Sequence, residues 1–302
     1  MSKRENKPMG RTVPRKGIIA AVAAVVLVII AVIVWAAVRG KKPDAEKPEG
    51  LLEELTSFQG VFRTVDQEEY DFFHALVQKN FPAASDEAEL DQMTRDYINQ
   101  MNAKFALGSY LGLCEPYSFA LLEFRMEQEN AIRAAKTANG EAVYGATQFT
   151  LESYFSYLET TLEEEIMNYL VEHADQPMLE QAEAYFDANP SIFTQLVSIS
   201  YELEENGQTS SETLTSTGMR SLEASDGTLA EFLYTAQPGE TLEDQLPDGS
   251  ARKATLIDAV YEVPDFDDAV STAVRSWLNA EIIDGLYESI AQNAPVSFAM
   301  DQ

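Results

Sequence analysis

Residues 150–169, TLESYFSYLETTLEEEIMNY, decide the first half of the fold, because their apolar side chains recur every three to four positions. That spacing places them on one face of an amphipathic helix, and Thr150 is a suitable N-cap. Residues 197–203, VSISYEL, follow a different period, with apolar and polar side chains in alternation, which is typical of a half-buried β-strand. The change of period within one chain predicts an α+β protein.

Helical spacing is found on both sides of the strand. Before it, capping residues and apolar spacing predict four more helices, over residues 66–81, 85–108, 117–138 and 178–188. Asp66 is expected to cap the first of them, and Gly108 is expected to end the second. After residues 254–263, a second predicted strand, a long helix begins at Asp265 and a short extended piece ends the chain.

The final helix needs a partner for its apolar face. The β-rich stretch between the two predicted strands is short and is interrupted by turn-forming pairs such as Asn206-Gly207. So small a module cannot bury the whole apolar face of the helix that follows it. We therefore expect this helix, with Trp277 in its stripe, to return and pack on the N-terminal helices.

Residues 17–38, GIIAAVAAVVLVIIAVIVWAAV, contain no charge. A helix of this length, at about 1.5 Å per residue, spans the roughly 30 Å hydrocarbon core of a bilayer. A cleavable signal peptide is the competing interpretation, but its apolar region is usually about 7–15 residues. Since most of the flanking Lys and Arg residues precede the span, the N-terminus is predicted to be cytoplasmic and the body extracytoplasmic. The sequence thus predicts an uncleaved signal-anchor and a single-pass protein of the cell membrane.

The charge of the chain is uneven. Residues 1–42 carry nine Lys and Arg and one Glu, a formal +8, so the remainder must carry −37 to give the net −29. A body this acidic repels phosphate backbones, which excludes nucleic acid as a partner. One Cys and two His residues cannot build a disulfide or a Cys/His zinc site, so we expect no metal and no cofactor.

Several aromatic residues are adjacent in the predicted helices: Phe72 and Phe73, then Tyr154, Phe155 and Tyr157. Neighbours on a helix point about 100° apart, so a narrow apolar stripe cannot take them all. One interpretation is that some of them line a groove for unfolded or extended polypeptide. The simpler alternative is a wide buried face that takes all five.

Three stretches of the body carry a family resemblance. They are residues 149–158, FTLESYFSYL, residues 180–193, EQAEAYFDANPSIF, and residues 282–298, which end in Pro-Val-Ser-Phe. The chain in these stretches resembles the parvulin-containing foldases and chaperones of bacterial envelopes, the SurA and PrsA families. The resemblance implies a helical cradle, similar to the SurA N-terminal domain, that is completed by a helix following the isomerase module.

The same resemblance argues against isomerase chemistry. Parvulins place a His in the first strand of the module and another in the last. Here Tyr201 stands at the first position and Leu256 at the second, and neither side chain can replace an imidazole. We therefore expect a degenerate, shortened parvulin-like module with no catalytic residue.

The expected organisation has six segments: a basic tail (1–16), a transmembrane helix (17–38), a linker (39–50), a helical chaperone-like domain (51–190), a parvulin-like β-rich module (191–263) and a C-terminal helix with a short strand (264–302). The expected function is a membrane-anchored, extracytoplasmic bacterial chaperone or foldase that binds unfolded or extended secreted polypeptides. An active peptidyl-prolyl cis–trans isomerase is one alternative, and a non-enzymatic envelope scaffold for one partner is another. The sequence does not indicate an oligomeric state.

Overall fold

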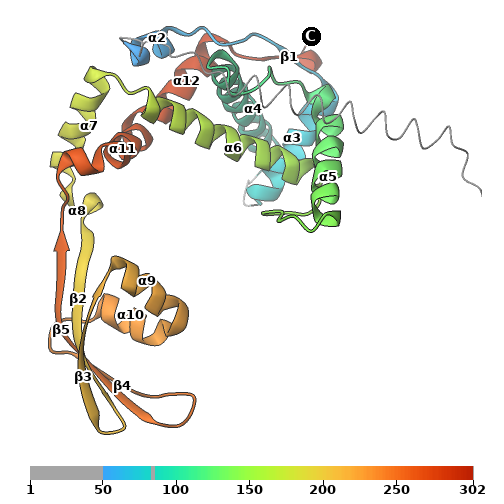
Figure 1. Cartoon of the computed structure of the whole chain (residues 1–302). Helices are drawn as coiled ribbons and strands as arrows, with labels where there is room; N and C mark the ends of the chain where they lie inside the picture. The colour runs from blue at the N-terminus through green and yellow to red at the C-terminus, as the bar shows by residue number, and fades with distance from the viewer. Residues whose placement is uncertain (1–49, 83–85, 302) are drawn as a thin grey trace, which may run out of the picture. The chain divides into compact units, whose positions relative to one another are not determined.

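The computed structural model describes residues 50–82 and 86–301, and this part of the chain is α+β (Figure 1). The helices before the sheet are α2 (Leu51–Ser57), α3 (Gln67–Asn80), α4 (Glu87–Tyr110), α5 (Leu122–Ala138), α6 (Leu151–Glu172), α7 (Gln176–Ala188) and α8 (Pro190–Phe193). A two-residue strand, β1 (Thr64–Val65), lies between α2 and α3, and a 3₁₀ turn (Phe119–Leu121) precedes α5.

The membrane-spanning helix in the predicted fold class requires correction. Within residues 50–82 and 86–301, no helix combines the length and the apolar composition needed to cross a bilayer. The predicted span itself, residues 17–38, lies outside the described residues. The fold class is therefore corrected to α+β without a transmembrane helix in the described chain, and the signal-anchor and the cell-membrane localisation that depended on that helix are withdrawn with it.

Capping residues begin the helices largely where the sequence predicts. Asp66 accepts a hydrogen bond from the backbone N–H of Glu69 at 2.9 Å, and Thr150 forms a capping box with Ser153. The predicted start of the second helix at Ser85 is one residue early, because Asp86 is the N-cap that accepts from Glu89 N at 2.8 Å. Each cap satisfies a backbone N–H that has no partner within its own helix.

Gly108 does not end its helix, contrary to the prediction. The helix α4 continues to Tyr110, and Gly108 lies where α4 packs on α6. An ideal Cβ at this position would be 2.5 Å from Cδ1 of the buried Leu162 and 3.1 Å from Sγ of Cys114. The glycine therefore permits the close approach of two helices.

The β module is a four-stranded antiparallel sheet with strand order β3-β2-β5-β4. Its strands are β2 (Gln195–Glu205), β3 (Gln208–Thr215), β4 (Thr241–Gln245) and β5 (Ala251–Glu262). Asn206 and Gly207 both have positive φ and form the predicted tight turn between β2 and β3. The helices α9 (Ser216–Ser225) and α10 (Gly227–Thr235) lie on one face of the sheet and were not predicted (Figure 1).

The C-terminal segment returns to the N-terminal helices. It consists of α11 (Phe266–Trp277), a π-helical turn (Leu278–Ile282), α12 (Ile283–Asn293), β6 (Ser297–Phe298) and a final 3₁₀ turn (Ala299–Asp301). The helix α11 contacts α6 and α7, α12 contacts α4 and α2, and β6 pairs in parallel with β1. Trp277 is only 3% exposed within the same hydrophobic cluster as Phe73 and Phe155, which confirms its expected burial.

Candidate functional site

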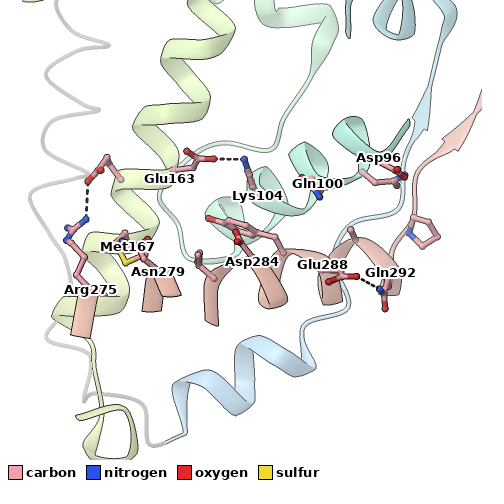
Figure 2. Close-up of a pocket in the computed structure, with 16 residues that line it drawn as sticks. Asp96, Gln100, Lys104, Glu163, Met167, Arg275, Asn279, Asp284, Glu288 and Gln292 are labelled. Atoms are coloured by element: carbon pink, nitrogen blue, oxygen red, sulfur yellow. Dashed lines mark hydrogen bonds and ion pairs between the residues drawn. The ribbon is translucent and has the colours of Figure 1, made fainter. Parts of the chain in front are cut away.

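An open groove of about 940 Å³ lies among α4, α6, α11 and α12 (Figure 2). Four kinds of side chain line it: carboxylates, amides, two cations and a few apolar groups. The lining includes Asp96, Gln100, Lys104, Glu163, Glu164, Met167, Arg275, Asn279, Asp284, Tyr287, Glu288 and Gln292.

Two helical rows form the long sides of the groove. Asp96, Gln100 and Lys104 follow one another at four-residue spacing along α4, and Asp284, Glu288 and Gln292 do so along α12 (Figure 2). Four residues of helix rise about 6 Å, so each row is about 12 Å long. An extended chain advances about 3.3 Å per residue, and the rows therefore match about four residues of it.

Lys104 links the α4 row to α6. Its ammonium group donates to Glu159 Oε1 at 3.0 Å and also to Glu163, and it lies 5.7 Å from the centre of the Tyr287 ring. Burial lowers the pKa of Lys104, but the hydrogen bonds to Glu163 and Glu159 outweigh burial and hold this pKa above its usual value. Lys104 is thus a charged cross-link between α4 and α6.

Arg275 fixes the end of the groove. Its guanidinium group donates to Glu164 Oε2 at 3.2 Å and to the amide oxygen of Asn168, both on α6. These contacts join α11 to α6 and leave Glu164 engaged with a cation. Both cations of the lining therefore have carboxylate partners inside the protein.

The floor of the groove is less polar than its rim. Met167 and Tyr287 are buried side chains, whereas Gln100, Asp284 and Glu288 are exposed. Burial raises the pKa of Tyr287, and the nearby carboxylates of Glu163, Asp284 and Glu159 raise it further, so its hydroxyl stays protonated. The floor can contact apolar atoms while the rim offers hydrogen bonds.

A π-helical turn shapes the α12 side. Leu278–Ile282 interrupts the α-helical repeat between α11 and α12 and contains the lining residue Asn279. Such a turn places an extra residue in one helical turn and rotates the faces that follow. Ile283, the first residue of α12, is buried, and Ile282, the last residue of the turn, is partly buried against the same core.

The ionisable residues of the groove lining are Asp, Glu, Lys, Arg and Tyr. Among the described residues that form the groove, none is Ser, Thr, Cys or His, so it holds no Ser–His or Cys–His pair. No group of three His, Cys, Asp or Glu residues in the described chain could hold a metal ion. Burial raises the pKa of the Cys114 thiol to about 11, which keeps this side chain unreactive near neutral pH.

The five aromatic residues proposed from the sequence do not line this groove. Phe73 and Phe155 are fully buried with ring centres 5.0 Å apart, Phe72 packs against both, and Tyr154 is buried in the same cluster. Tyr157 is 39% exposed and stacks on Phe149 at 5.1 Å. A wide buried face therefore accounts for Phe73, Tyr154 and Phe155, while a binding role for Phe72 or Tyr157 stays a prediction.

Tyr201 and Leu256 are direct partners across β2 and β5. Both are buried in the core of the β module, and the Tyr201 hydroxyl donates to Glu212 Oε2 at 2.8 Å. Burial is the first cause that raises the pKa of Tyr201, followed by its hydrogen bond to Glu212. The two positions thus lie side by side, with side chains that pack the core of the β module.

Sequence reasoning did not identify the groove. Glu163, Glu164 and Glu165 had the pattern of a solvated helix face, and nothing local distinguishes the lining carboxylates from other surface acids. The available signal was the four-residue repeat of polar side chains at Asp96, Gln100 and Lys104 on the same helix as an apolar stripe. Such a row indicates only a polar face of one helix. It becomes the side of a groove only when α6 and α12 pack beside it, which the sequence does not indicate.

No family model and no curated protein matches this sequence. Among solved structures, the chain is similar to one described with the virulence factor PEB4 and the periplasmic protein Cj1289, two structurally related SurA-like chaperones of Campylobacter jejuni. The TM-score is 0.27 at 9% identity, and the match covers 72% of this chain and 88% of that chain. The description of the neighbour is consistent with a SurA-like family and does not test the parvulin-like module.

Proposed function

We propose that the protein is a chaperone-like binding protein and that its groove holds a short extended segment of non-native polypeptide. The observation that carries the proposal is the open groove with amide and carboxylate side chains on its rim and Tyr287 and Met167 on its floor. Backbone N–H and C=O groups of an extended segment need hydrogen-bonding partners, which Gln100, Asn279 and Gln292 can supply regardless of the sequence bound.

The proposed binding unit is discontinuous in the chain. One wall comes from residues 51–190 and the other from residues 264–302, so the groove requires both segments. The β module, residues 191–263, is proposed to have no isomerase activity, since the side chains at its two key positions are core residues. The alternative of a scaffold for a single partner uses the same groove and differs only in selectivity.

Blocking the groove tests the proposal. In the full chain, Gln100→Trp places a large ring over the lining, and Gln128→Trp makes the same change at an exposed position of α5 outside it. Suppression of aggregation is measured for three unrelated unfolded proteins, and circular dichroism checks that both variants are folded. Loss of suppression for all three clients in Gln100→Trp alone is the expected result. Loss for one client indicates the scaffold, and equal activity of both variants contradicts the proposed site.

A further inference from the structure

The groove has a charge that its own cations do not balance. Lys104 is engaged by Glu159 and Glu163, and Arg275 by Glu164, so both are held by carboxylates of α6. The lining still presents Asp96, Asp284 and Glu288, all exposed. Carboxylates gathered on two walls of one groove attract positive charge and repel negative charge.

The spacing of these carboxylates is also specific. Asp284 and Glu288 are four residues apart on α12, which places them about 6 Å apart along the helix axis. In an extended chain, side chains two residues apart point the same way and are about 6.6 Å apart. Two cations at alternate positions of an extended segment can therefore each meet one carboxylate, whereas adjacent cations point to opposite sides.

We infer that the groove prefers extended polypeptide segments with Lys or Arg at alternate positions. One cation meets Asp284 and the next meets Glu288, and Asp96 on the opposite wall contributes to the same field. Gln292, which donates to Glu288 Oε1 at 3.1 Å, holds the second carboxylate in place. This inference rests on the proposed function, because it specifies which segments that groove selects.

Peptides of equal composition test the spacing. The full chain is titrated with three labelled ten-residue peptides and followed by fluorescence anisotropy. They are alternating Lys and Ser, a block peptide of the same composition in which adjacent pairs of Lys and of Ser alternate (KKSSKKSSKS), and alternating Glu and Ser. No two Lys of the block peptide are two residues apart, so no two of them can meet Asp284 and Glu288 from the same side of an extended segment. The alternating Lys peptide is expected to bind about three- to tenfold more tightly than the block peptide, as two exposed ion pairs allow. The Glu peptide is expected to bind least, and the difference should shrink at high salt.

A matched pair of double variants tests the residues. Asp284→Asn with Glu288→Gln removes the α12 carboxylates, and Glu183→Gln with Asp187→Asn makes the same change at the same spacing on exposed positions of α7 outside the groove. Only the α12 variant should lose the preference for alternating Lys. Equal binding of the alternating and block peptides overturns the inference alone. If none of the peptides and none of the unfolded clients binds, the proposed function is contradicted as well.

Discussion

Asp175 and Leu51 are 124 positions apart in sequence, yet Asp175 Oδ2 accepts a hydrogen bond from the backbone N–H of Leu51 at 3.0 Å. The same oxygen accepts from Gly50 N at 2.8 Å, and Oδ1 accepts from Met178 N at 3.1 Å. One buried carboxylate therefore caps the N-termini of both α2 and α7. Without it, several backbone N–H groups would lose their partner at once.

This double cap predicts a larger loss of stability than a single cap does. Asp175→Ala should lower the free energy of unfolding by about 2–3 kcal/mol, since each lost cap costs about 0.5–2 kcal/mol. Asp86→Ala, which removes the exposed cap of α4 alone, should cost about 1 kcal/mol. Urea denaturation of the full chain measures both values, and equal losses would contradict the double role of Asp175.

Trp277 tests the packing of the C-terminal helix on the N-terminal helices. Trp277→Ala should cost about 3–5 kcal/mol, because it leaves a cavity in the cluster shared by α6 and α11. Ser271→Ala, an exposed change on the same helix, should have little effect and serves as the control. The unfolding midpoint in urea reports both, and a loss below about 1 kcal/mol at Trp277 would exclude a packing role of this size.

The β module contains a buried cation that predicts a pH dependence. Arg252 pairs with Asp244 and with Asp226, and Asp226 also caps α10. Burial raises the pKa of Asp226, but the hydrogen bonds from Arg252 and from backbone N–H groups outweigh it, so the pKa is lowered from 3.8. A carboxyl whose pKa falls on folding stabilises the protein above pH 3.8, and that contribution disappears as the pH falls through the lower value in the folded state.

Asp226→Asn should therefore destabilise the module near neutral pH by about 2–4 kcal/mol, as expected when a buried cation loses one partner. The difference from the unmodified chain should shrink as the pH falls below 3.8. Thermal unfolding of both proteins, followed by circular dichroism between pH 2.5 and 7, provides the comparison. The lower limit is about one unit below the ordinary pKa of an Asp carboxyl. A difference that is constant over this range would refute the role of the Asp226 charge.

The burial of Tyr201 and Leu256 predicts no prolyl isomerase activity. In the presence of the full chain, the cis–trans isomerisation of an X-Pro peptide should keep its uncatalysed rate, with a time constant on the order of 10–100 s. A protease-coupled assay with a short X-Pro peptide measures this, with a known isomerase as the positive control. Clear acceleration that Tyr201→Phe abolishes would identify a working site.

Elements with strong local signals could be predicted from the sequence. Thr150 and its apolar stripe identified α6, and Asn206-Gly207 identified the turn after β2. The strand β3 could not be predicted, because its residues QTSSETLT are almost all polar and exposed and their strand conformation depends on pairing with β2. Propensity is overridden there by tertiary contact.

The groove depends on features that no local pattern contains. The π-helical turn at Leu278–Ile282 interrupts the single long helix that the apolar spacing after Asp265 predicts. Lys104 and Glu163 are 59 positions apart, and Arg275 and Glu164 are 111 apart. Their pairing is fixed by the packing of whole helices, which a single sequence does not reveal.

The parallel pairing of β1 with β6 has a consequence for the order in which the chain folds as it is synthesised. Thr64 pairs with Ser297 and Val65 with Phe298, so the core around α3, α4 and α6 is completed only after residues 297–298 have been synthesised. The β module, by contrast, is continuous from Gln195 to Glu262 and has its own cluster of buried residues. We expect this middle segment to form first during translation, while the earlier helices keep apolar surface exposed until residues 266–298 have been synthesised.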